Sequence, residues 1–134
     1  FRRVLFRSNL PIRKVAKGTW KSTSEIGESY FDGYKLLLKY GAKVEDNGVN
    51  FVIKWASEYG RLDIIQDQLD SGCKSGFVDA FAWMGHTRKL PNEQLKKQVG
   101  LLLREKAQEF EPKLWEDMIA KLKTRGKKPW VDEI

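Results

Sequence analysis

The chain has very little cysteine and histidine and no long apolar run, and each absence removes a class of protein. Its one cysteine, Cys73, cannot form a disulfide within the chain, which fits a reducing compartment and predicts a cytoplasmic location. With a single histidine, His86, the chain cannot form a histidine-rich metal site. No apolar run approaches the roughly 20 residues that cross a bilayer, and no glycine-rich phosphate loop is present. We therefore expect no membrane span, no metal and no cofactor.

Residues suited to catalysis are equally scarce. Cys73 and His86 each have a simple structural interpretation, as a small buried apolar side chain and as a packing or hydrogen-bonding residue. Asp63, Asp67 and Asp70 recur at three- and four-residue spacing, which would suit paired carboxylates in acid–base catalysis but more simply forms a solvated helix face. An enzyme is therefore the least favoured class.

What is present is a helical pattern, clearest from Gly60 to Gly72. The segment Trp55-Ala56-Ser57-Glu58-Tyr59 precedes it, and apolar residues at helical spacing fill the interval between the two glycines. Small residues, a glycine, a helical pattern and a glycine cap predict a helix, a tight turn and a second, antiparallel helix. Such a hairpin cannot bury its apolar face alone, so we expect further hairpins stacked beside it.

Other parts of the chain repeat this pattern. The matching segments are residues 34–42 for a second helix and residues 10–18 and 77–86 for first helices. Here the chain resembles the ankyrin repeat family, whose unit is a β-turn followed by two helices. Leu10-Pro11-Ile12-Arg13 is close to the family's T-P-L-H signature, and Gly85-His86 matches its Gly-His pair at the inter-helix turn. The resemblance covers roughly residues 10–106 and implies an all-α, ankyrin-like helical-hairpin solenoid of about three repeats.

Two longer loops and a final helix complete the predicted architecture. Residues 19–28 and 87–91 are expected as loops between the helices of the first and third copies. Asn92 can cap a helix that begins at Glu93. A C-terminal capping helix is expected to start at Glu111-Pro112 and to stop at Gly126. Its apolar face is expected to contain Leu114, Met118, Ile119 and Leu122.

The two ends of the chain are expected to differ from the repeat domain at residues 9–126. Residues 2–8 resemble the translation of a sequencing-library adapter, which predicts a non-native segment 1–8 in a gene recovered from metagenomic DNA. A genuine basic arm is the alternative. Residues 127–134 are interpreted as a polar tail, in which Pro129-Trp130 either docks on the domain or hangs free.

Basic residues outnumber acidic ones and gather in two places. The net charge is +7, from 25 basic and 18 acidic residues. One cluster consists of Arg13, Lys14, Lys17 and Lys21, and the other of Lys121, Lys123, Arg125, Lys127 and Lys128. Such clusters attract phosphates or acidic protein surfaces, although lysines near a helix C-terminus also complement the helix dipole. The second cluster is the candidate nucleic-acid-binding set.

The resemblance implies a non-catalytic protein–protein interaction module that binds a partner protein through its turn tips and first helices. Carried over to this sequence, the partner-binding residues are Glu45, Asp46, Asn47, Val49, Glu58, Tyr59, Trp83 and Met84. Packing of Trp83 and Met84 against a neighbouring hairpin is the alternative for those two residues. A small basic accessory protein that binds nucleic acid, or a nucleic-acid–protein complex, is the second candidate function. A structural subunit of a larger assembly is the third.

Overall fold

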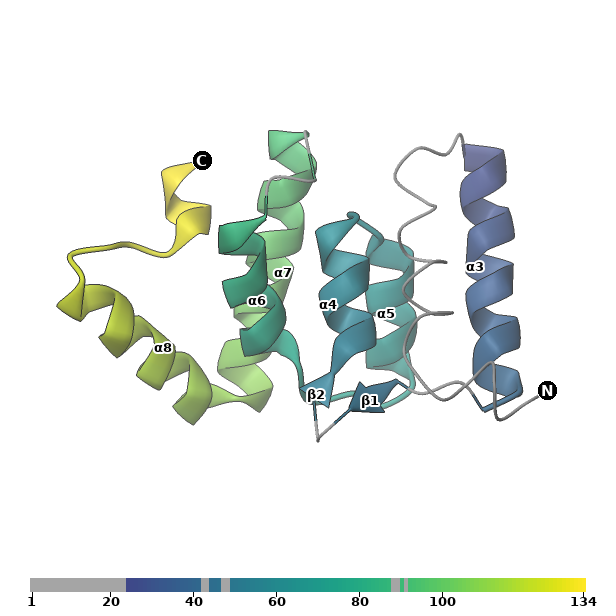
Figure 1. Ribbon diagram of the computed structural model, residues 1–134, viewed down its shortest axis with the longest axis horizontal. Coiled ribbons are helices and arrows are strands. Elements are labelled where there is room, and N and C mark those ends of the chain that lie inside the picture. Colours follow the sequence, from purple (N-terminus) through teal and green to yellow (C-terminus); the bar gives the residue numbers. More distant parts are fainter. Residues whose placement is uncertain (1–23, 42–43, 47–48, 88–89, 91) are drawn as a thin grey trace.

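The structure is a computed structural model that describes residues 24–41, 44–46, 49–87, 90 and 92–134. Its elements, in chain order, are α3 (Ser24–Lys39), β1 (Glu45–Asp46), β2 (Val49–Asn50), α4 (Phe51–Glu58), α5 (Leu62–Asp70), α6 (Phe77–His86), α7 (Glu93–Phe110), α8 (Pro112–Thr124) and the short 3-10 helix η1 (Trp130–Glu133). The two strands pair antiparallel, with Glu45 opposite Asn50. Apart from this short pair, the regular elements of the described part are helical, as expected for the all-α class (Figure 1).

Predictions for the N-terminal part fall outside the described residues. These are the adapter-like segment 1–8, the first helix at 10–18 and the basic cluster from Arg13 to Lys21. The loop expected over residues 19–28 is wrong in its second half, because α3 already begins at Ser24.

The hairpin predicted around Gly60 is present as α4 and α5. Asn50 caps α4, since its side-chain oxygen accepts hydrogen bonds from the backbone N–H groups of Val52 at 2.9 Å and Ile53 at 3.2 Å. These N–H groups have no partner inside the helix, so a side-chain acceptor there fixes the helix start. Gly60 lies in the turn with φ of 71°, a left-handed conformation that glycine adopts without strain.

Helices α6 and α7 form the second antiparallel pair. The predicted cap of α7 is confirmed, because the Asn92 side-chain oxygen accepts a hydrogen bond from Leu95 N at 3.0 Å. The expected position of Gly85-His86 at an inter-helix turn is wrong, since both residues belong to the last turn of α6. Gly85 instead lies where the indole ring of Trp130 approaches α6, and a Cβ atom added to it would meet the ring at 3.0 Å.

A distant carboxylate supplies the cap of α6. Gly76, the residue before the helix, has no side chain to accept a hydrogen bond. The Glu111 carboxylate, between α7 and α8, accepts from the backbone N–H groups of Phe77 at 2.8 Å and Val78 at 3.1 Å. An acidic group at a helix N-terminus also interacts favourably with the helix dipole. Glu111 thus joins the start of α6 to the end of α7.

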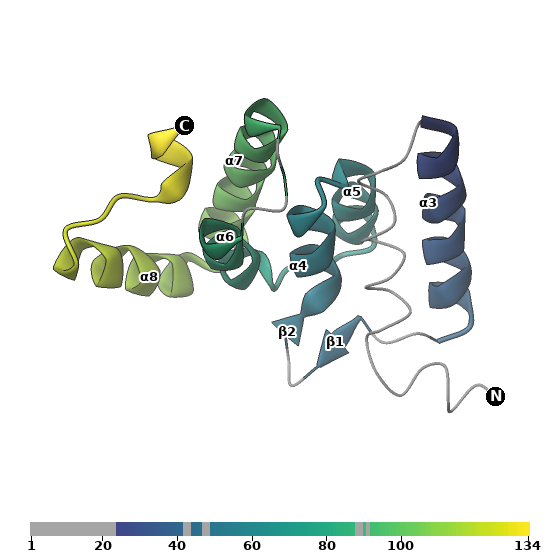
Figure 2. The same cartoon turned by 45° about the horizontal axis from the view of Figure 1, so that its top comes forward.

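The helices lie side by side rather than around one centre (Figures 1 and 2). Helix α4 contacts α5 within its own pair and α6 in the next pair, and α6 in turn contacts α7. The apolar core runs between these layers and includes Ile53, Ala56, Ile65, Phe77, Ala80, Met84, Val99 and Leu103. Burial of this continuous core holds the pairs together.

Helix α8 and the segment after it close the C-terminal end. Pro112 stands in the first turn of α8, as expected. The apolar face is shifted from the expected one, because Trp115 is buried whereas Leu114 is 54% exposed. The segment after Gly126 docks on the domain: Trp130 stacks on Phe81 with ring centroids 5.0 Å apart. The tail interpreted as polar therefore supplies a tryptophan that packs against the core.

Candidate functional site

The first candidate site is a surface that we call the tryptophan face, formed by Lys54, Trp55, Asp79 and Trp83. It crosses from α4 to α6, the adjacent first helices of the two pairs. The two indole rings meet edge to face with centroids 6.2 Å apart. The Lys54 ammonium lies 4.3 Å from the Trp83 ring centroid and 5.6 Å from that of Trp55, and pairs with the Asp79 carboxylate at 4.0 Å. Both tryptophans are half-buried, and their rings are held against each other and against the Lys54 ammonium.

One polar atom of this face has no partner in the described part of the chain. The indole N–H of Trp83 is shielded from solvent and donates to no acceptor among the described residues. A shielded donor without an acceptor costs free energy, because it has lost its hydrogen bond to water.

For three of the expected partner-binding residues, burial contradicts contact with a partner, and for Met84 it agrees with the alternative of packing against a neighbouring hairpin. Glu58, Tyr59 and Met84 are 0%, 3% and 0% exposed, so their side chains are not available on the surface. Met84 packs in the core between the helix pairs, and the Glu58 carboxylate faces the segment after α6, where the Thr87 hydroxyl donates to it at 3.5 Å. The last turn of α4 is covered by its neighbours, which the resemblance alone did not indicate.

The expected contact residues at the turn before α4 lie in the strand pair. Glu45 and Asp46 form β1, and Val49 begins β2. Asn47 lies outside the described residues. The strand pair leads directly into α4, so these residues stand at the N-terminal end of that helix.

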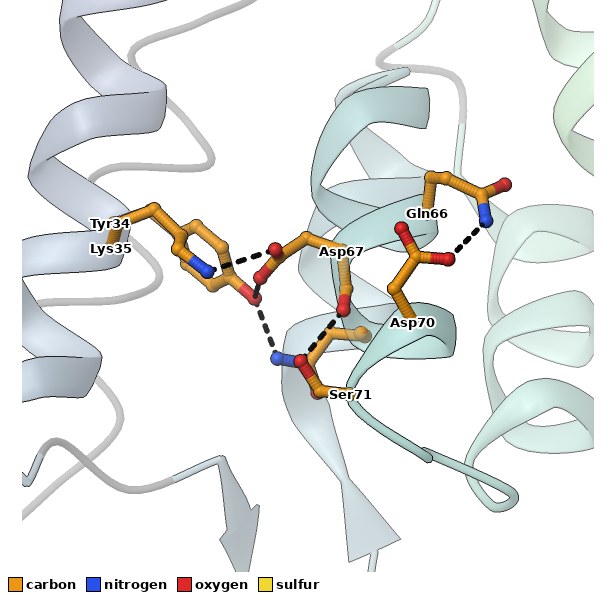
Figure 3. Close-up of polar contacts among 7 residues, drawn as sticks. Tyr34, Lys35, Gln66, Asp67, Asp70 and Ser71 are labelled. Carbon is orange, nitrogen blue, oxygen red and sulfur yellow. Dashed lines mark hydrogen bonds and ion pairs between the residues drawn. The ribbon is translucent and has the colours of Figure 1, made fainter.

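A network of hydrogen bonds joins α3 to α5. Figure 3 shows Tyr34 and Lys35 of α3 directed at Asp67 of α5, with contacts of 2.9 Å from the phenol and 2.9 Å from the ammonium to its two oxygens. Gln68 donates to the same phenol oxygen at 2.6 Å. Tyr34 is 0% exposed, and its burial raises the pKa of the phenol above its ordinary value. Asp67 is thus a structural residue.

The same network continues to the only cysteine. The Asn50 side-chain amide donates to Gln68 at 3.0 Å and to the Cys73 sulfur at 3.1 Å. The Cys73 thiol in turn donates to the Ser75 carbonyl at 3.3 Å. Cys73 is half-buried and lines a shallow pocket of about 360 Å³. These contacts give Asn50 and Cys73 a structural role in joining α4, α5 and the segment before α6.

The second candidate site is a groove of about 440 Å³ between α6, α8 and the C-terminal segment, which we call the basic groove. Four members of the candidate nucleic-acid-binding set line it, and all five are exposed. They are Lys121, Lys123, Arg125, Lys127 and Lys128, of which Lys123 does not line the groove. The structure therefore gathers most of this set around one concave surface.

In the described part of the chain, the side chains suited to metal binding or acid–base catalysis do not cluster into a site. No group of three or more His, Cys, Asp or Glu side chains there is placed to hold a metal ion. Asp63 pairs with Arg61, and Asp70 accepts from Gln66 at 2.8 Å (Figure 3), so these two aspartates make contacts on the helix surface, whereas Asp67 joins α5 to α3. No described helix has the length and apolar character to span a bilayer.

Two structural features of the candidate sites could not be predicted from the sequence. The association of Lys54 with the two tryptophans was missed because it joins different helices, although Trp55 and Trp83 carried the signal. For Trp130 the sequence left docking and a free tail open, because its partner Phe81 lies 49 residues earlier in the chain.

Comparisons of the chain with protein-family models, with curated proteins and with solved structures each find no match.

Proposed function

We propose that the chain is a non-catalytic protein–protein interaction module, built as a divergent ankyrin-like solenoid, that binds a partner protein through the tryptophan face. It works without a cofactor, in the cytoplasm. Support comes from the order of elements, in which a short strand pair is followed by α4 and α5 and then by α6 and α7. The second helices α3 and α5 both end at a left-handed glycine, Gly41 with φ of 88° and Gly72 with φ of 91°.

The observation that carries the proposal is the packing of Trp55, Trp83 and Lys54 across two neighbouring helices. Tryptophan is enriched among the few residues that carry most of the binding energy of an interface. Here the two rings are held by each other and by the ammonium, so little side-chain entropy is lost when a partner binds. Glu45, Asp46 and Val49, directly before α4, are proposed as the outer edge of the same contact.

The test is comparative capture of partner proteins with immobilised wild-type chain and with a Trp83→Ala variant. A specific partner is retained by the wild type and lost from the variant. For that partner, the dissociation constant of Trp83→Ala rises about 30-fold, which corresponds to roughly 2 kcal/mol for a tryptophan at the centre of an interface.

Leu101→Ala serves as the matched control, because Leu101 is an exposed apolar residue on α7 and does not belong to the tryptophan face. Circular dichroism and thermal unfolding establish that both variants fold. Retention of the same proteins at equal affinity by the wild type and by a folded Trp83→Ala variant would contradict the proposal.

A further inference from the structure

The basic groove has an apolar floor that the charge pattern alone does not explain. Phe81 and Ala82 of α6, Met118 and Leu122 of α8, and Trp130 of the C-terminal segment form it. Its volume of about 440 Å³ lies within the usual range of about 300–1,000 Å³ for binding pockets. A floor of this kind accepts an apolar group and excludes water from it.

The rim of the groove is cationic. Lys121 and Arg125 stand at the end of α8, and Lys127 and Lys128 follow it. The helix dipole accounts for a cation in the last turn of α8, but not for Lys127 and Lys128, which lie beyond the helix after Gly126. None of these four cations forms an ion pair with another described residue. One acidic side chain, Glu133, faces them, so the groove keeps a positive excess.

The surroundings of Trp130 favour a peptide over a nucleic acid as the occupant. One face of its indole is stacked on Phe81 at an interplanar angle of 30°, and its N–H donates to the Phe81 carbonyl at 2.7 Å. The ring edge lies against the backbone of α7 at Gly100, where an added Cβ atom would overlap it. Proteins that hold single-stranded nucleic acids offer open aromatic faces to the bases. Trp130 belongs to the floor of the groove, and the ring face that is stacked on Phe81 is closed to a base.

We propose that the basic groove binds an acidic peptide segment that inserts one large apolar side chain. The apolar side chain packs on Leu122, Met118 and Trp130, and flanking carboxylates pair with the cations of the rim. Charge complementarity selects the acidic segment, and the apolar floor selects the inserted side chain. The groove shares no residue with the tryptophan face. This site therefore goes beyond the proposed function and is tested independently of it.

The experiment is a fluorescence-anisotropy titration of the full chain with a labelled short peptide in which acidic residues flank one leucine. A second peptide has serine in place of leucine, and a single-stranded DNA of equal charge is the third probe. At about 0.15 M salt, the leucine peptide is expected to bind more tightly than the serine peptide and the DNA. In the double variant Lys127→Glu/Lys128→Glu, binding of the leucine peptide weakens by about tenfold or more.

A matched control separates a local site from the net charge. Lys74→Glu/Lys97→Glu changes the net charge equally at exposed positions outside the groove, and it should weaken peptide binding by less than about threefold. Leu122→Ala removes the preference for leucine over serine, whereas Leu114→Ala, at an exposed position of the same helix, keeps it. Circular dichroism checks that all variants fold.

Three results would overturn the proposal. The first is absence of leucine-peptide binding at millimolar concentration. The second is an equal loss of binding in the two double variants, which would mean that the peptide is attracted by the net charge of the chain and not by the groove. The third is tighter binding of the DNA with a steep salt dependence that Lys127→Glu/Lys128→Glu removes, which would assign the groove to nucleic acid.

Discussion

At the residue scale, two glycines with the same backbone conformation carry different constraints. Gly72 and Gly76 have φ of 91° and 90°. A Cβ atom at Gly72 would meet nothing within 4 Å, whereas at Gly76 it would lie 2.8 Å from the backbone carbonyl oxygen of Asn50. An alanine would therefore have a strained backbone at both positions, but it would overlap a neighbouring atom only at Gly76.

We expect Gly72→Ala to lower the free energy of unfolding by about 1 kcal/mol, the cost of a left-handed conformation for a residue with a Cβ atom. Gly76→Ala should cost roughly 1–3 kcal/mol more, because a backbone atom cannot move aside as a side chain can. Urea denaturation of the two variants measures the difference. Equal losses would contradict the close approach of Asn50 to Gly76.

At the element scale, the C-terminal segment docks on α6 and α7 around one aromatic residue, Trp130. The ring of Trp130 lies between Gly85 and Gly100, beneath the ammonium of Lys96 at 5.3 Å. Close by, Val131 is 2% exposed and Asp132 accepts from Arg104 at 2.9 Å. The absence of a side chain at both glycines makes room for the indole.

This packing predicts that the effect of Gly100→Ala changes sign with the residue at position 130. Alanine in the middle of a helix is normally more stable than glycine by about 1 kcal/mol. In the wild type, overlap with Trp130 should outweigh that gain, so Gly100→Ala lowers the free energy of unfolding. In a Trp130→Ala background the overlap is gone, and Gly100→Ala should raise it by about 0.5–1 kcal/mol.

A double-mutant cycle from thermal or urea unfolding measures this coupling. Stabilisation by Gly100→Ala in both backgrounds would mean that Trp130 does not dock at α7.

The elements that the sequence predicted best carry their own local signals. Gly60, Asn92 and Pro112 each act on the helix beside them, and the turn, cap and helix start expected from them are present. Contacts between distant residues were not predictable in this way. The cap that Glu111 gives to α6 and the docking of Trp130 depend on which helices become neighbours.

At the scale of the whole molecule, the same limit explains the outcome for the candidate site. Helical spacing predicts which residues share a face, but the neighbouring helices decide which face is covered. Glu58 and Tyr59 were expected on the surface and are buried by these neighbours. For Met84 and Trp83 packing was left open as an alternative; Met84 is buried, whereas Trp83 is only half-buried. The exposure of the C-terminal cations could be predicted without knowledge of the neighbouring helices, because long charged side chains remain in water wherever the helix packs.

The stability of the whole molecule should depend on alkaline pH through Tyr34. Burial raises the pKa of its phenol, so above about pH 10 the unfolded chain loses this proton while the folded chain keeps it. The contribution of the neutral phenol to the free energy of unfolding is fully present below about pH 10. Above that pH, the free energy of unfolding falls by up to about 1.4 kcal/mol for each further pH unit.

Urea denaturation between about pH 9 and pH 11 should therefore show a steeper loss for the wild type than for Tyr34→Phe, which has no phenol to ionise. Gln66→Ala, which removes an exposed contact to Asp70 within α5, is the control and should keep the wild-type slope. Identical slopes for the wild type and Tyr34→Phe would contradict the buried position of the phenol.

Asn50 has a consequence for the shape of the molecule. Its side chain caps α4 and contacts Gln68 and Cys73, while its carbonyl oxygen limits the approach of Gly76 at the start of the next pair. Asn50 is thus one of the contacts between the first helix pair and the start of the next. Because α4 and α6 are in direct contact, we expect exchange of Asn50 to alter their packing and, with it, the angle at which the two indole rings are presented.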